Sequence, residues 1–79
     1  MHFTYILKSA KSGKFYVGMS ADPERRLSEH NAGKVTSTKP GIPWEKVYQE
    51  EFETLAQARK REKYFKTAAG RRFRKKLDL

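Results

Sequence analysis

The sequence predicts an α+β fold: a three-stranded antiparallel sheet with flanking helices, in the order β-β-α-β-α-α. Two runs of aromatic and branched residues near the start are separated by turn residues, and two later segments begin with strong helix N-cap signals. With 79 residues the chain is expected to form a single domain over residues 1–79. So small a core is expected to cover little more than one face of the sheet with helices.

The first two strands are expected over residues 3–9 and 15–19, joined as a hairpin through Lys11-Ser12-Gly13-Lys14. If the turn centres on Ser12-Gly13, Tyr5 lies opposite Ser20, about 13 Å along the strand from Tyr16. The side chains then divide between two faces, one with Tyr5, Leu7, Tyr16 and Gly18 and the other with Ile6, Phe15, Val17 and Met19.

The first helix is predicted to begin at Asp22-Pro23, because Asp favours the N-cap and Pro fits the first turn. It should end at residues 31–33, where Gly33 can adopt the left-handed conformation. Residues 36–43, with two prolines and a glycine, are predicted to form a long loop. A third strand is expected over residues 44–52.

The second helix is predicted from the capping box of Thr54 and Gln57 and should run to about residue 69. Gly70 is expected to interrupt it, and residues 71–77 to form a short basic helix with Phe73 and Leu77 facing inward. Helical spacing predicts an inward stripe on the second helix that consists of Leu55, Ala58, Phe65 and Ala69.

The charge is strongly basic, with 18 Lys and Arg against 9 Asp and Glu, a net charge of +9. Residues 56–79 carry ten of the basic residues against Glu62 and Asp78, whereas residues 45–55 are acidic. This pattern indicates a polyanionic partner, nucleic acid ahead of a membrane surface, and no obligate protein partner is evident. The absence of cysteine excludes disulfides and Cys-based zinc sites, and no segment resembles a signal peptide or a membrane span, so a cytoplasmic protein is expected.

Glu62 lies on the inward stripe of the second helix, where a carboxylate is costly unless a cation or a metal meets it. Two interpretations follow: an ion pair with a nearby arginine, or a metal-binding glutamate at the edge of a pocket. Arg26 and His30 are four residues apart on the first helix and so share one face. They form either a solvated surface or a cation cluster directed at phosphate.

Tyr5 and Tyr16 are either packing residues of the hairpin or part of a site, and Gly18 beside them leaves room for close approach. Tyr5-Ile6-Leu7 and Tyr16-Val17-Gly18 resemble the two half-motifs of the GIY-YIG nucleases. The segment 22–31 is similar to the family's helix, with Arg26 and His30 at the offsets of its catalytic arginine and following His or Tyr. The segment 58–66 resembles the late helix whose glutamate binds the metal, here Glu62.

The resemblance covers essentially the whole chain, which most resembles the small stand-alone bacterial members related to the N-terminal nuclease domain of a bacterial excinuclease. It implies an endonuclease that hydrolyses nucleic-acid phosphodiesters, DNA more than RNA, in DNA repair or recombination. Two positions depart from the pattern: Met19 replaces a basic residue found in some members, and residues 63–79 contain no asparagine. These departures imply altered substrate positioning or slower activity.

The implied mechanism uses one Mg²⁺ or Mn²⁺ on Glu62, since hard cations accept a single carboxylate and keep several waters. Arg26 would stabilise the transition state, and Tyr5 would accept a proton from the attacking water. Tyr5 would do so either directly or after losing its own proton, and because a free phenol has a pKa of about 10 this requires neighbouring cations to favour the phenolate. Tyr16 would orient the water or Tyr5, and His30 would hydrogen-bond in the same cluster.

Two alternatives remain from the residues alone. The first is a nucleic-acid-binding module without catalysis, in which Trp44, Tyr48 or Tyr64 stacks on bases while Lys14, Lys34 and residues 71–76 follow the phosphate backbone. The second is a partner-binding domain that uses the acidic residues between positions 45 and 53. Metal-dependent cutting discriminates a nuclease from both.

Overall fold

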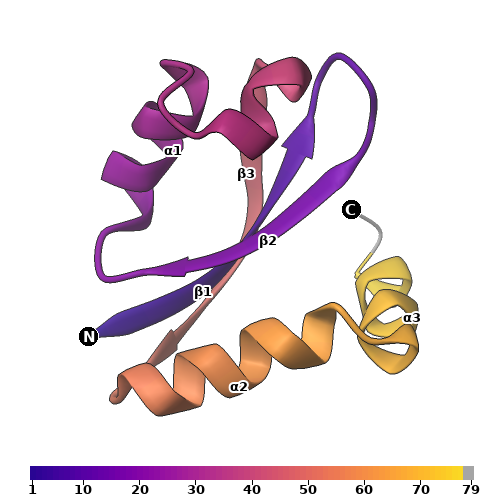
Figure 1. The fold of residues 1–79 in the computed structure, drawn as a ribbon. Coiled ribbons are helices and arrows are strands. Elements are labelled where there is room, and N and C mark those ends of the chain that lie inside the picture. The colour runs from indigo at the N-terminus through magenta and orange to yellow at the C-terminus, as the bar shows by residue number, and fades with distance from the viewer. Residues whose placement is uncertain (78–79) are drawn as a thin grey trace.

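The computed structural model describes residues 1–77 and confirms the predicted α+β fold and its order of elements (Figure 1). The elements are β1 (His2–Ser9), β2 (Phe15–Ser20), α1 (Pro23–Asn31), the 3₁₀ helix η1 (Thr36–Gly41), β3 (Trp44–Phe52), α2 (Leu55–Phe65) and α3 (Ala68–Lys76). Within the described part of the chain, no helix is both long and apolar enough to cross a membrane.

The sheet has the order β2-β1-β3 and is antiparallel throughout, so β1 is its central strand. Four consecutive residues of β1, from Thr4 to Leu7, are buried, with at most 1% of each exposed. Because successive side chains of a strand point to opposite faces, both faces of β1 must be covered. The expectation that helices cover little more than one face is therefore wrong.

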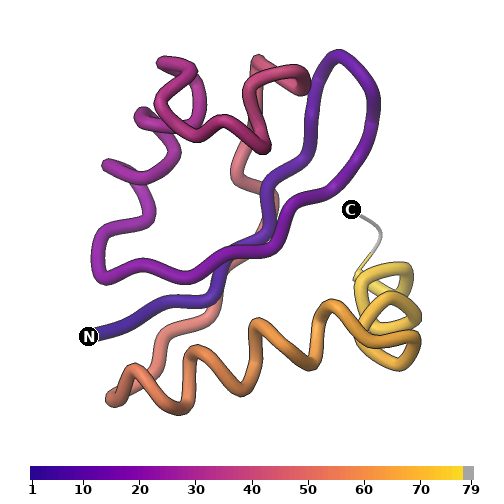
Figure 2. The backbone as a smooth tube through the Cα atoms, viewed as in Figure 1, coloured from indigo at the N-terminus to yellow at the C-terminus, as the bar shows by residue number. Residues whose placement is uncertain are grey.

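Two thin cores lie on the two faces, and the helices divide between them, as Figure 2 shows for the path of the chain. On the face covered by α1 and η1, the buried residues are Tyr5, Leu7 and Trp44. On the face covered by α2 and α3, they are Ile6, Val17 and Phe65. Thr4 fixes α2 to the central strand, since its hydroxyl donates to the Ala58 carbonyl at 2.7 Å.

The hairpin register differs from the prediction by two residues. Tyr5 lies opposite Gly18 rather than Ser20, and Leu7 lies opposite Tyr16. The Ser9 amide donates to the Lys14 carbonyl at 2.8 Å, so the turn centres one residue earlier than Ser12-Gly13. A shift of two residues preserves the faces, because side chains alternate with a period of two. The predicted sharing of faces is therefore confirmed, and Tyr5 and Tyr16 become diagonal neighbours.

Gly70 does not interrupt a helix; it lies in the first turn of α3. The second helix ends at Phe65, and Thr67 caps α3 by accepting a hydrogen bond from the Gly70 amide at 3.1 Å. A Cβ at position 70 would lie 2.5 Å from the Phe65 Cα, so glycine is required for α3 to pack against the end of α2. The predicted extension of α2 to residue 69 is wrong for this reason.

The predicted inward stripe of α2 is half correct. Ala58 and Phe65 are buried, but Leu55 is 46% exposed at the start of the helix, and Ala69 is exposed on α3. Residues 36–43 are also not a plain loop, since most of them form η1. Thr38 stabilises this turn, because its hydroxyl and its amide both donate to the Val35 carbonyl at 3.2 Å.

Candidate active site

The hydroxyl of Tyr5 is the centre around which the candidate residues gather. Tyr5 extends from the central strand and is 1% exposed. A Cβ at Gly18, directly across on β2, would lie 2.6 Å from that hydroxyl and 3.1 Å from the Tyr16 ring. The missing side chain of Gly18 therefore makes room for Tyr5 itself, where the sequence predicted room for a ligand.

His30 connects Tyr5 to η1 through a chain of hydrogen bonds. The Tyr5 hydroxyl lies 3.1 Å from His30 Nε2, and His30 Nδ1 lies 2.7 Å from Thr38 Oγ1. Thr38 donates its single hydroxyl proton to the Val35 carbonyl, so it must accept from Nδ1–H. Nε2 is then free to accept the proton of Tyr5. The hydrogen-bond pattern thus assigns the neutral Nδ1–H tautomer to His30.

Burial, followed by the charge of Arg26, lowers the pKa of His30 below 6.5. Both effects disfavour the imidazolium, and the nearby carboxylate of Glu29 opposes them only in part. His30 is fully buried, whereas most other side chains of its helix are exposed or only partly buried. The ring is therefore a neutral acceptor at pH 7.

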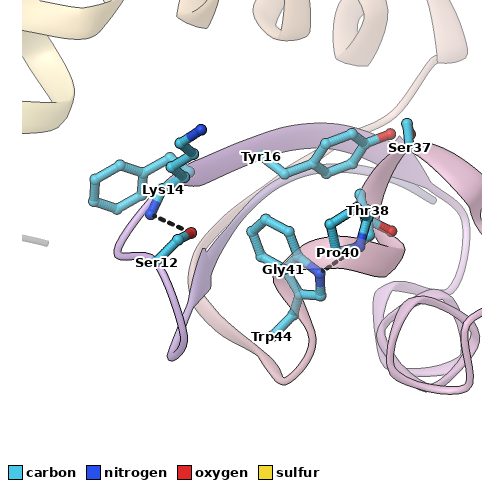
Figure 3. A pocket seen from close by; sticks show the side chains of 9 residues that line it. Ser12, Lys14, Tyr16, Ser37, Thr38, Pro40, Gly41 and Trp44 are labelled. Atoms are coloured by element: carbon cyan, nitrogen blue, oxygen red, sulfur yellow. Dashed lines mark hydrogen bonds between the residues drawn. The ribbon is translucent and has the colours of Figure 1, made fainter.

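Tyr16 lies against the same histidine. Its ring centroid is 5.0 Å from that of His30, at an interplanar angle of 61°, and it also meets the edge of Trp44 at 6.3 Å. Beside it is a hollow of about 400 Å³ between the hairpin loop and η1 (Figure 3), lined by Ser12, Lys14, Phe15, Tyr16, Ser37, Thr38, Pro40, Gly41 and Trp44. Trp44 donates its indole N–H to the Thr38 carbonyl at 2.7 Å and is 9% exposed. It is therefore a packing residue and is not free to stack on a base.

Arg26 brings a positive charge from α1 to Tyr5. Asp22 caps that helix by accepting from the Arg25 amide, and Arg26 follows in the first turn. The guanidinium of Arg26 lies 2.9 Å from Glu29, and its side chain is 39% exposed. Burial raises the pKa of Tyr5, and the positive charge and hydrogen bonding of Arg26 oppose that rise in part. Arg26 thus lies between the buried phenol and solvent, where a phosphate can reach it.

Glu62 approaches from α2, which packs on β1 and β2. Its side chain is 22% exposed, and its ion pair is with Lys66 at 3.8 Å rather than with an arginine. The neighbouring Arg61 instead binds Glu50 through two hydrogen bonds of 2.7 and 3.2 Å. Glu62 is close enough to Tyr5 for its charge to raise the pKa of the phenol. Among residues 1–77, the Glu62 carboxylate therefore has one long ion pair and no hydrogen bond that holds it.

Arg26 acts on Tyr5 in the direction that a phenolate requires, but the net effect on the pKa of Tyr5 is the opposite. Burial first, and then Tyr16, raise the pKa of Tyr5 to about 12, and Arg26 offsets only part of that rise. The resting state of Tyr5 is therefore the neutral phenol. Any loss of its proton has to be coupled to the acceptor that it already contacts, which is His30.

The structure brings together Tyr5, Tyr16, Arg26 and His30, from three different elements. Glu62, on α2, has no hydrogen bond or ion pair with them and acts on Tyr5 through its charge. Two other participants were missed. Thr38 holds the histidine, but a threonine in a predicted loop carries no spacing signal. Glu29 binds Arg26, and its place three residues later on the same helix face could have indicated this contact.

Comparison with known proteins finds a matching family and several similar proteins. The family described as the GIY-YIG catalytic domain matches residues 1–76. A UPF0213 protein of Staphylococcus saprophyticus is 42% identical over 79 residues, which cover 99% of this chain and 92% of that protein. A UPF0213 protein of Enterococcus faecalis is 41% identical, over 82% of this chain and 76% of that protein. A UPF0213 protein of Staphylococcus aureus strain N315 is 42% identical, over 84% of this chain and 80% of that protein. No solved structure gives a significant match.

Proposed function

Because the chain belongs to the GIY-YIG family, a superfamily of nucleases, we propose that it is a metal-dependent endonuclease that hydrolyses phosphodiester bonds in nucleic acid, with DNA preferred to RNA. One observation carries the proposal: the buried Tyr5 hydroxyl has a proton acceptor in contact with it, and the charges of Arg26 and Glu62 both act on its pKa. Packing alone requires none of these three groups around a tyrosine.

Glu62 is the residue that would hold the metal. Among residues 1–77, no group of three or more His, Cys, Asp or Glu side chains could enclose an ion, so a site made entirely of protein ligands is not the expected kind. A single carboxylate with one long ion pair suits Mg²⁺ or Mn²⁺, which keep most of their water. When bound, such a cation supplies positive charge to the phosphate and to the leaving alkoxide.

Tyr5 and His30 would act together as the base. As water attacks phosphorus, one of its protons passes to the Tyr5 oxygen while the Tyr5 hydroxyl proton passes to His30 Nε2. The imidazolium that forms keeps its Nδ1–H bond to Thr38. The phenol never has to exist as a free phenolate, which the raised pKa of Tyr5 would oppose. The step ends with cleavage of the phosphorus–oxygen bond to the leaving group.

Arg26 would bind the non-bridging oxygens of the reacting phosphate. Its guanidinium is half-exposed beside Tyr5, and Arg binds phosphate in two places at once. Removing a donor of this kind typically costs a factor of about 10²–10³ in rate. To reach the phosphate, Arg26 would exchange its contact with Glu29 for one with the substrate.

The test is cleavage of labelled single-stranded, duplex and branched DNA in the presence of Mg²⁺ or Mn²⁺. Glu62→Gln and Arg26→Ala should abolish or strongly reduce cutting while binding persists. Matched controls are Glu53→Gln, an exposed glutamate, and Arg25→Ala, whose side chain is 77% exposed on the same helix. If the protein binds these DNAs but cleaves none of them with either metal, the nuclease proposal is wrong. The alternative, nucleic-acid binding without catalysis, would then hold.

A further inference from the structure

A second hollow, of about 240 Å³, lies between the start of β2 and α3, away from Tyr5. Its lining consists of Phe15, Arg71, Arg74 and Lys75. Three of these four residues are cations and none is acidic. A hollow with positive walls and no counter-charge attracts an anion.

Arg74 has no hydrogen-bond or ion-pair partner inside the described part of the chain. Its Nε is buried and has no hydrogen-bond partner, and burial followed by the charge of Arg71 lowers its pKa. Arg61 shows how the same fold treats a structural arginine, since Glu50 binds it with two hydrogen bonds. Arg74 therefore resembles a residue prepared for a ligand more than one that holds the fold together.

Phe15 gives the hollow an aromatic wall. The ring is 38% exposed on the edge strand β2, an unusual position for a large apolar side chain with two cations close to it. The Arg74 guanidinium and the Lys8 ammonium each lie 5.6 Å from the ring centroid. An exposed aromatic ring next to cations is the combination by which proteins stack a base while binding its phosphate.

The hollow is next to the candidate active site along the chain. Phe15 immediately precedes Tyr16, and because strand side chains alternate, the two project to opposite faces of β2. A nucleic-acid strand that passes along this edge can meet Tyr16 on one side and Phe15 on the other. The consecutive residues therefore place one aromatic ring at each site, on the two faces of the same edge strand.

We propose that Arg71, Arg74 and Lys75 bind a nucleic-acid phosphate at a distance from the reacting one, and that the Phe15 ring stacks on the adjacent base. The inference rests on the proposed function only in taking nucleic acid as the partner. It assigns a subsite to residues that do not contribute to the chemistry at Tyr5.

The experiment is oligonucleotide binding by fluorescence anisotropy in EDTA, over a range of salt concentrations, so that no cutting occurs. Arg74→Gln should weaken binding at least about 5-fold more than Arg72→Gln, which removes the same charge from an exposed position of α3 outside the hollow. It should also lower the slope of log affinity against log salt by about one. Arg74→Lys should keep the slope and still bind more weakly, because the Nε donor is lost.

Phe15→Leu distinguishes a nucleic-acid site from a simple anion site. It should weaken binding about 5-fold or more to a normal oligonucleotide and leave unchanged the binding of one that carries an abasic spacer. Stability provides the second readout. Urea unfolding of Arg74→Gln should show no loss, since the variant removes a buried donor that has no hydrogen-bond partner among residues 1–77.

Equal effects of Arg74→Gln and Arg72→Gln on binding would overturn the proposal, as would a destabilised Arg74→Gln protein that binds normally. If the wild type cuts DNA normally and either of these results is found, the nuclease function is retained and the subsite at Arg74 is rejected. Binding that depends on Arg74, without any cutting, would instead retain the subsite and remove the proposed catalysis.

Discussion

The Tyr5 hydroxyl lies 3.1 Å from His30 Nε2, although 25 positions separate the two residues in the chain. The contact joins the central strand to the end of α1, and Thr38 fixes which nitrogen of the ring accepts. A buried tyrosine is thereby supplied with a proton acceptor whose own protonation is disfavoured. Several measurable consequences depend on this one hydrogen bond and on the packing around it.

Stability should depend on pH through His30. Its folded pKa lies below the 6.5 of the unfolded chain, so between these two values the unfolded state binds more protons. The free energy of unfolding therefore falls as the pH drops from 7 through 6.5 and towards the folded pKa, and it is regained as the pH rises. Urea unfolding between pH 5.5 and 8 should show this slope. His30→Gln should flatten it, whereas His2→Gln, at the other histidine, should not; equal slopes in the three proteins would contradict the buried neutral ring.

Thr38→Val should impair catalysis because it changes which ring nitrogen of His30 carries the proton. The substitution keeps the shape but leaves the His30 Nδ1–H without its acceptor, at a cost of about 1–3 kcal/mol in stability. The proton is then free to occupy Nε2, which removes the acceptor of Tyr5. Nitrogen NMR of the imidazole should report the change of tautomer together with slower cutting. Thr38→Ser, which retains the hydroxyl, should restore both, and a wild-type tautomer in the valine variant would refute the assignment.

Gly18→Ala should displace Tyr5. The new Cβ would lie 2.6 Å from the Tyr5 oxygen and 2.7 Å from Cζ, too close for either to remain in place. Overpacking of this kind costs about 1–3 kcal/mol, and the cutting rate should fall further, since the hydroxyl leaves His30. A double-mutant cycle with Tyr5→Phe provides the check. If the two changes act through the same hydroxyl, their effects on rate should be far from additive, and full additivity would count against this explanation.

Gly70→Ala should destabilise the fold without touching the candidate site. A Cβ there would lie 2.5 Å from the Phe65 Cα, and the obstacle is backbone that cannot rotate away. We expect a loss of about 3 kcal/mol, at the upper end for overpacking, from urea unfolding. Ala69→Ser, an exposed neighbour on the same helix, should change stability by less than about 0.5 kcal/mol. A fully stable Gly70→Ala protein would show that α3 does not pack as described.

Local signals allowed most of the fold to be predicted, and its errors came from tertiary contacts. The helix starts at Asp22 and Thr54 were confirmed because capping depends on residues three positions apart. The hairpin faces were also correct, but the register was not, since it depends on where Ser9 closes the turn. Gly70 was misread because the reason for a glycine there is the backbone of another helix.

The candidate site shows the same division. Tyr5, Tyr16, Arg26, His30 and Glu62 were found through their resemblance to a family pattern, and their catalytic roles stay predictions. Properties of the site that depend on tertiary packing could not be predicted from the sequence. These include the burial that raises the pKa of Tyr5 to about 12 and the threonine that orients the histidine. The exposure of Phe15 was equally hidden, because alternation predicts which way a side chain points and not what covers it.

The central position of β1 has a consequence for how the protein folds while it is being synthesised on the ribosome. The strand that both other strands need as a template is the one synthesised first, yet its partner β3 follows some forty residues later and α2 later still. Until β3 and α2 are synthesised, the apolar side chains of β1 stay partly exposed to solvent. Strand pairing between residues so far apart in the sequence also slows folding. The candidate residues enter in the same order, with Tyr5 first and Glu62 last. A nascent chain therefore carries an incomplete set of them until the polypeptide through α2 has emerged and folded back onto its own beginning.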